Sequence, residues 1–249
     1  MINPSHVLLA LSLLLPAAAI AAAQSRVDSA RLYVARGASW LEKGEIERAI
    51  SDYDLALAFD PRSVAAWLNR GVARSRKGDY EGAFNDYTKA LELDPRQYAA
   101  WNEMGNLLAE KGDLKGAIAA FDRAIEIDPG LAALFNNRGR AHLADGDLEM
   151  ASIDLERALA LDPKLADAWA HRGIIRAERR DYARAIADFD QALKLNPRLA
   201  NTWANRGLAL MIQGRIEEAE QSYVRYRELG GKGNPAPEEL LHKLRGRGK

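Results

Sequence analysis

The sequence has no cysteine and only four histidines, which excludes several kinds of site. Without thiols the chain forms no disulfide, holds no thiolate zinc centre and has no cysteine nucleophile. No two histidines stand at metal-ligand spacing on one helix face, and no phosphate-binding loop motif is present. We therefore expect no enzyme activity, no metal ion and no cofactor.

The chain also lacks an excess of charge of either sign. Lys plus Arg and Asp plus Glu each total 35 in 249 residues, so the formal net charge is zero. Proteins that bind nucleic acids usually carry a net basic face, and this composition gives no global reason for one. The sequence therefore disfavours a nucleic-acid partner.

Charged residues are absent from the first 23 positions, and residues 7–23 are apolar or small. Ala21 and Ala23 match the small-x-small pattern of a signal peptidase site, so we predict a signal peptide cleaved after Ala23. The mature protein would then be periplasmic or secreted. An uncleaved membrane anchor is the alternative, although this apolar run is at the short limit for spanning a bilayer. A cytoplasmic protein with an unusual start is a third interpretation.

Prolines recur at a constant interval of 34 residues, each preceded by Asp or Asn. They are Pro61, Pro95, Pro129, Pro163 and Pro197. A chain that repeats one supersecondary unit of this length is a solenoid, in which each unit buries its apolar face against its neighbours. The function is therefore to be sought on a stacked surface.

Each copy repeats one ordered set of aromatic and small residues. In the second copy the set is Trp67, Gly71, Gly78, Ala83, Tyr87 and Ala90. Residues on either side of Gly78 form two helical stripes, so the unit is two helices joined by a turn. We expect Gly71 to let the two backbones approach while the ring of Tyr87 fills the space beside it. The aspartate after each turn, such as Asp79, is expected to cap the second helix.

These copies resemble the tetratricopeptide repeat family, bacterial type, from Ala30 to Gly230. The resemblance implies an all-α fold, a right-handed superhelical solenoid of antiparallel helix pairs. We predict a signal peptide or anchor at 1–23, a short linker at 24–29, six repeats at 30–63, 64–97, 98–131, 132–165, 166–199 and 200–230, and then 231–249 as a linker, a capping helix and a basic tail.

Arginine and aspartate vary together between the copies, 16 residues apart. The pairs are Arg36 with Asp52, Arg70 with Asp86, Arg138 with Asp154, and Arg172 with Asp188. In the third copy both partners are absent, leaving Met104 and Ala120. We predict a salt bridge between the two helices of a copy, half-exposed and contributing between zero and about 1 kcal/mol each.

In this family the first helix of each copy lines a concave face, and the resemblance carries that role to a defined set of positions. The set is Leu68, Val72, Asn102, Asn106, Asn136, Asn137, Arg140, Ile174, Leu208 and Met211. Its middle is polar and both of its ends are apolar. Asparagine offers a donor and an acceptor together, so these residues would bind the backbone of an extended peptide.

The resulting hypothesis is a noncatalytic exported adaptor that binds a protein or peptide along the concave groove, in a cell-envelope assembly. Its membrane contact would be limited to the N-terminal segment. The apolar patch of Leu208, Met211 and Ile212 also allows a homo-oligomer. The alternatives are a membrane-anchored scaffold that associates with itself, and a cytoplasmic adaptor.

Overall fold

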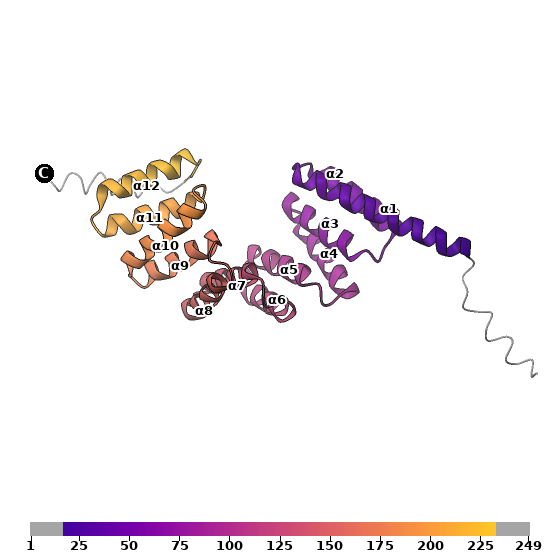
Figure 1. Cartoon of the computed structure of the whole chain (residues 1–249), viewed down its shortest axis with the longest axis horizontal. Helices are drawn as coiled ribbons and strands as arrows, with labels where there is room; N and C mark the ends of the chain where they lie inside the picture. The colour runs from indigo at the N-terminus through magenta and orange to yellow at the C-terminus, as the bar shows by residue number, and fades with distance from the viewer. Residues whose placement is uncertain (1–16, 233–249) are drawn as a thin grey trace, which may run out of the picture. The chain divides into compact units, whose positions relative to one another are not determined.

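The computed structural model describes residues 17–232, and every regular element in that part of the chain is an α-helix. Twelve helices follow one another along these residues (Figure 1). They are α1 (Ala17–Glu42), α2 (Ile46–Phe59), α3 (Val64–Lys77), α4 (Tyr80–Leu93), α5 (Tyr98–Glu110), α6 (Leu114–Ile127), α7 (Ala132–Asp145), α8 (Leu148–Leu161), α9 (Ala166–Glu178), α10 (Tyr182–Leu195), α11 (Ala200–Ile212) and α12 (Ile216–Glu228).

Sequential helices pack as antiparallel pairs, which confirms the predicted all-α solenoid class. The chain divides into two compact units, one ending at Leu107 and the other beginning at Leu108, within α5. Each unit has its own core. Tyr53 and Ala49 are fully buried in unit 1, and Phe189 and Leu210 are fully buried in unit 2.

The turn inside each pair follows from two local features. Glycine adopts a left-handed conformation at five of the described turns, as at Gly78 with φ of 87°. The next residue, Asp79, then accepts a hydrogen bond from the backbone N–H of Gly82 at 2.9 Å and caps α4. Asp113, Asp147 and Asp181 cap their helices in the same way. The predicted capping role of these aspartates is confirmed.

A close approach of two helices explains a second glycine in each copy. A Cβ atom added at Gly71 would lie 2.5 Å from Cε1 of Tyr87, and one at Gly173 would lie 2.5 Å from Cε1 of Phe189. Real Cβ contacts of this length do not occur, so only glycine leaves room for the ring. The predicted packing of the ring against the glycine is confirmed.

Asp-Pro and Asn-Pro sequences build the turn between copies. The Asp60 side chain accepts a hydrogen bond from the backbone N–H of Arg62 at 3.0 Å, which forms an Asx turn. The indole of Trp67 then donates to the carbonyl oxygen of Pro61 at 2.9 Å. The same indole bond recurs at Trp101, Trp169 and Trp203. The turn therefore fixes the start of the next copy.

The predicted salt bridges within copies form. Nitrogen–oxygen distances are 2.6 Å for Arg36 to Asp52, 2.7 Å for Arg70 to Asp86, 2.6 Å for Arg138 to Asp154 and 2.8 Å for Arg172 to Asp188. Three arginines also reach an aspartate of the preceding copy, so the ladder links neighbouring copies as well. These are Arg70 with Asp54, Arg138 with Asp122, and Arg206 with Asp190.

The burial of these pairs corrects the sequence prediction. The side chains of Asp86 and Asp154 are only 1% exposed, whereas half-exposed pairs were expected. A second side chain covers each of these carboxylates, because Arg74 also contacts Asp86 at 2.9 Å and His142 lies 4.0 Å from Asp154. Such buried carboxylates depend on their partners much more than surface ones do.

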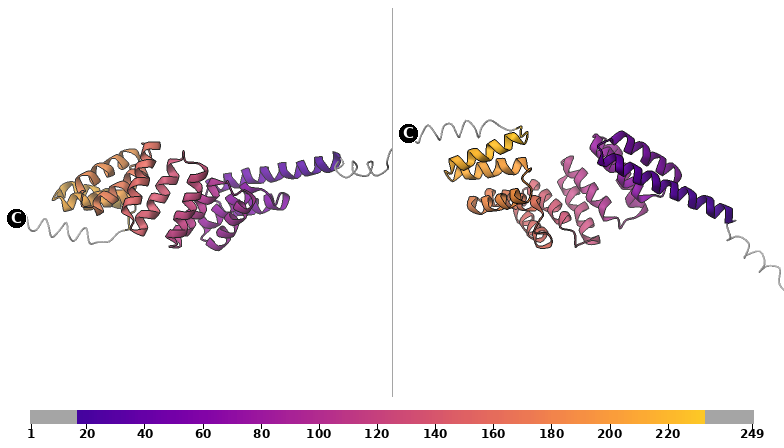
Figure 2. Two further views of the ribbon diagram at one scale, coloured as in Figure 1. Left: turned by 90° about the horizontal axis from the view of Figure 1, so that it is seen from below. Right: turned by 45° about the horizontal axis from the view of Figure 1, so that its top comes forward.

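Helix α1 is 26 residues long and runs without a break through the predicted linker at 24–29. Arg26 donates hydrogen bonds to the carbonyl oxygens of Ala58 and Phe59, at 3.1 and 3.3 Å, and so ties this stretch to the end of α2. Figure 2 shows the N-terminal part of α1 extending beyond the other helices of unit 1. None of the helices in the described residues has both the length and the apolar character needed to cross a membrane.

Two predictions concern residues that the structure does not describe. The signal peptide at 1–23 lies largely outside the described residues, and so does the capping helix expected within 231–249. Both stay predictions, as do the domain boundaries drawn from the repeat.

Candidate peptide-binding surface

The predicted groove residues are divided between the two units. In unit 1, Leu68 and Val72 on α3 and Asn102 and Asn106 on α5 are half-buried. In unit 2, α7 carries the polar residues, α9 carries Ile174, and α11 carries Leu208 and Met211. The predicted asparagine ladder has members in both units, so it stays a prediction.

The polar residues of α7 differ in their access to solvent. Asn136 is only 7% exposed, Asn137 is half-buried and Arg140 is exposed. Asn136 donates to the side-chain oxygen of Asn137 at 3.4 Å. Asn136 is therefore largely closed to a ligand, and its side chain instead helps to hold Asn137 in position.

Unit 2 contains a cavity of about 370 Å³ between α9 and α11, lined by both aliphatic and polar side chains; we call it the apolar cavity after the aliphatic ones. Ile174 and Ala177 line it from α9, and Leu208 and Ile212 line it from α11. Leu208 is 45% exposed and Ile212 is 51% exposed, so both aliphatic side chains are accessible to solvent at this cavity. Met211, by contrast, is 4% exposed and lies in the core beneath this surface, where it cannot touch a ligand directly.

A polar cavity of the same volume, about 370 Å³, adjoins the apolar one. Its polar lining comes from Asp167, His171, Asn201, Thr202 and Asn205, with Arg198 at the turn before α11. Ile174 and Asn205 line both cavities, so the two lie side by side. We call the combined surface the α9–α11 trough, defined by Asp167, His171, Ile174, Asn205, Leu208 and Ile212.

His171 is held in place by α7. Its Nδ1 lies 2.9 Å from Oδ1 of Asn136, and because a carboxamide oxygen only accepts, Nδ1 donates. The neutral ring then has an acceptor lone pair at Nε2. Burial lowers the pKa of His171 below its ordinary value of 6.5; Asp167 acts in the opposite direction and Arg140 lowers it further. At neutral pH the ring is therefore uncharged.

The charges of the trough cancel. The polar cavity has one acid and one base, Asp167 and Arg198, and the apolar cavity has Glu178 and Arg180. The lining between them is uncharged. Such a surface gives no preference to a ligand of one charge, and apolar contact and hydrogen bonding must select what binds.

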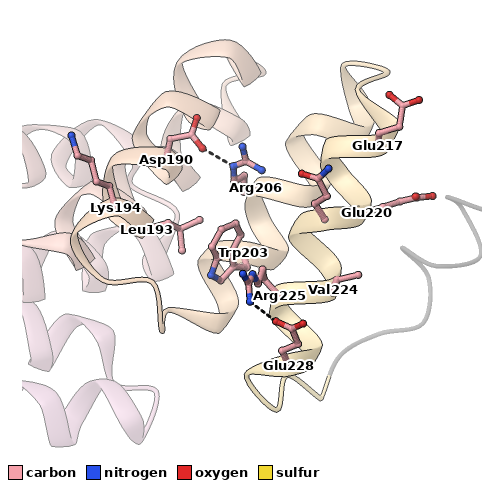
Figure 3. Close-up of a pocket in the computed structure, with 11 residues that line it drawn as sticks. Asp190, Leu193, Lys194, Trp203, Arg206, Glu217, Glu220, Val224, Arg225 and Glu228 are labelled. Carbon is pink, nitrogen blue, oxygen red and sulfur yellow. Dashed lines mark hydrogen bonds and ion pairs between the residues drawn. The ribbon is translucent and has the colours of Figure 1, made fainter.

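A larger cavity, of about 1030 Å³, lies among α10, α11 and α12. Figure 3 shows Trp203 and Arg206 of α11 between the side chains of α10 and those of α12. Two ion pairs border it, Arg206 with Asp190 at 2.6 Å and Arg225 with Glu228 at 2.7 Å. Its mixed lining of both charges and few apolar groups indicates no particular class of ligand.

Within the described part of the chain, no group of three or more His, Asp or Glu residues could hold a metal ion. The buried titratable groups are also accounted for by structural roles. Asp86, Asp154 and Asp188 are bound by arginines, and no nucleophile stands beside them.

Comparison with family models identifies the repeats directly. A tetratricopeptide repeat model matches residues 39–87, 68–132 and 172–234, and a second tetratricopeptide model matches 132–165. The chain belongs to the tetratricopeptide repeat family. Members of this family generally bind proteins or peptides and typically have no catalytic activity, so the chain is a protein-binding adaptor.

Solved structures of this family share the fold at low sequence identity. A chain of the APC/C Cut9–Hcn1 heterotetramer has a TM-score of 0.79 at 20% identity, over 89% of this chain and 45% of its own length. PilF of Pseudomonas aeruginosa has a TM-score of 0.76 at 19% identity, over 90% of this chain and 99% of its own. YrrB has a TM-score of 0.56 at 21% identity, over 78% and 97%. No curated protein matches the chain significantly.

The outcome for the predicted residues is mixed. The structure brings Ile174 and Leu208 together in one cavity, but it buries Met211 below the surface. Sequence reasoning missed His171 and Asn205, which lie two residues after an aromatic, at Trp169 and Trp203. A signal for them was present, because polar residues recur at that offset as Asn69, Glu103, Asn137, His171 and Asn205.

Proposed function

We propose that this tetratricopeptide repeat protein is a noncatalytic adaptor that binds a protein or peptide in the α9–α11 trough. The observation that carries the proposal is the trough itself, where the exposed Leu208 and Ile212 stand beside a polar cavity. Binding sites commonly combine apolar side chains with a few placed polar groups, and the trough offers both. YrrB, which shares the fold, is described as having an unusual peptide-binding site.

The binding surface is tested by capture with the full chain. Leu208→Glu and Ile212→Glu together place two charges in the trough at exposed positions, so the fold is retained. Val224→Glu is the matched control, because Val224 is 41% exposed on α12 and lies outside the trough. We expect the double variant to lose partners that the wild type and the control both retain. Equal capture by all three proteins would rule out the trough as the binding surface.

We further propose that the adaptor is exported and works in an assembly of the cell envelope. Support comes from the uncharged N-terminal segment and the Ala21-x-Ala23 pattern. N-terminal sequencing of the mature protein tests this. A chain beginning at Gln24 in the periplasmic or secreted fraction is the expected result, and an intact chain in the cytoplasm would contradict export.

A membrane-anchored scaffold is the second candidate, and α1 is the observation that favours it. This helix continues from Ala17 past Ala23, and Arg26 attaches it to the end of α2. An uncleaved segment would therefore join the repeats through a continuous helix. The same sequencing experiment decides between the candidates, because an anchored protein keeps its first residues and stays with the membrane fraction.

A further inference from the structure

The chemistry of the α9–α11 trough is specific enough to describe its ligand, provided that the proposed binding function holds. At its apolar end, Ile174 and Ala177 of α9 and Leu208 and Ile212 of α11 line one cavity. Polar side chains, those of Glu178, Arg180 and Asn205, line the same cavity beside them. An apolar side chain entering here would lose its contact with water, as would the exposed surfaces of Leu208 and Ile212.

At the polar end, His171 offers a hydrogen-bond acceptor. Its Nδ1 donates to Asn136, so in the neutral ring Nε2 carries the acceptor lone pair. The ring lines the polar cavity next to Ile174, the residue shared with the apolar cavity. A donor on a ligand anchored in the apolar cavity is therefore close to an acceptor that is fixed in position.

The surrounding charges favour an uncharged donor. Asp167 and Arg198 balance each other at the polar end, and Glu178 and Arg180 do so at the apolar end. A peptide backbone supplies an N–H group without a charge, at a constant short distance from the side chain of the same segment. Asn205, between the two cavities, has a donor and an acceptor for the same backbone.

From this juxtaposition, we propose that the trough binds an extended peptide segment that inserts one uncharged apolar side chain between Leu208 and Ile212. A neighbouring main-chain N–H of that segment donates a hydrogen bond to Nε2 of His171. The ligand is thus a peptide with an apolar anchor residue and no required charge. His171 is the residue that fixes the position of its backbone.

The first experiment selects peptides from a random displayed library on the full-length protein. We expect the selected peptides to share one apolar position, and their binding to be lost with Ile212→Glu but retained with Val224→Glu. Thermal unfolding of both variants checks that the fold is intact. Peptides that share a charged position instead, or that bind equally well to Ile212→Glu, would overturn the inference.

The second experiment tests the hydrogen bond to His171. One selected peptide is synthesised as a series in which each backbone amide in turn is replaced by an ester, which removes one N–H. One ester should weaken binding to the wild type about five-fold, the typical effect of losing a hydrogen bond. The variant His171→Asn keeps a donor for Asn136 but lacks the acceptor at Nε2. For this variant the same ester should have no further effect.

The variant His171→Gln is the matched control, because its side-chain oxygen can reach the position of Nε2. It should restore most of the sensitivity to the ester. If every ester weakens binding equally to the wild type and to His171→Asn, the hydrogen bond does not exist. Failure of the library to yield any trough-dependent peptide would refute the proposed function, whereas trough-dependent peptides without this ester effect refute only the role of His171.

Discussion

Buried carboxylates between helices are the most consequential single residues in this protein. Asp154 is 1% exposed and accepts two hydrogen bonds from Arg138, at 2.6 and 2.8 Å. Asp154→Ala removes these bonds and leaves a largely buried guanidinium with only Asp122 as its partner. We expect this variant to lose about 3 kcal/mol of unfolding free energy in denaturant titration.

The third copy supplies a control for this prediction. At the equivalent positions it has Met104, Leu108 and Ala120, an apolar set. The triple variant Arg138→Met, His142→Leu, Asp154→Ala introduces that set into the fourth copy. Since no unpaired buried charge remains, and Asp122 is left half-exposed to water, we expect most of the lost stability to return. A triple variant less stable than Asp154→Ala alone would contradict this, and would show that Arg138 and His142 stabilise the fold without the Asp154 carboxylate.

The tyrosine hydroxyls at Tyr53 and Tyr223 are the two buried polar side-chain atoms in the described residues without a hydrogen-bond partner. Phe121 and Phe189 fill the same slot in other copies. Removing an unsatisfied buried hydroxyl is therefore expected to be neutral or to stabilise the protein by up to about 1 kcal/mol. Thermal unfolding of Tyr53→Phe measures this, and a clear loss of stability would show that the hydroxyl has a partner.

The same residue gives a pH dependence. Burial raises the pKa of Tyr53 from 10.0 to about 12 in the folded protein. Between these values the unfolded chain has lost the proton and the folded one has kept it, so the unfolding free energy falls as pH rises from 10 to 12. Unfolding of Tyr53→Phe should lack this part of the decline. Parallel curves for the two proteins over that range would contradict the assignment.

At the scale of the helix and its turn, one residue departs from the pattern. Arg180 has φ of 62° at a turn where the other described copies have glycine. This conformation costs a residue with a Cβ about 1–2 kcal/mol. Because glycine also has more freedom in the unfolded chain, we expect Arg180→Gly to gain only about 1 kcal/mol in denaturant titration. A loss of stability would mean that the Arg180 side chain supports the fold.

The elements were largely predictable from sequence, because each repeated residue has a local role that acts the same way in every copy. Gly78, Asp79 and Pro61 act through backbone conformation and short-range hydrogen bonds, which depend on a few neighbouring residues. The length of α1 was not predicted. Residues 24–29 lie before the first copy and carry no repeat, and the contacts of Arg26 with the end of α2 depend on tertiary packing.

At the scale of the whole molecule, the binding surface was only partly predictable. The family offsets led to Ile174 and Leu208, which the structure brings together, and also to Met211, which it buries. His171 was not predicted as a site residue, because what fixes its ring is a hydrogen bond to Asn136, which lies 35 positions away on another helix. Such pairing depends on how copies stack, and a pattern within one copy does not report it.

The central claim is that a peptide binds in the α9–α11 trough, and photo-crosslinking tests it most directly. A photoreactive residue is placed at Leu208 in one protein and at Val224 in another, and each is irradiated with a peptide selected on the wild type. Both positions are similarly exposed, at 45% and 41%, so reactivity alone does not distinguish them. Crosslinks from position 208 and none from 224 are the result we predict. Crosslinks from 224 alone, or equally from both, would contradict the claim.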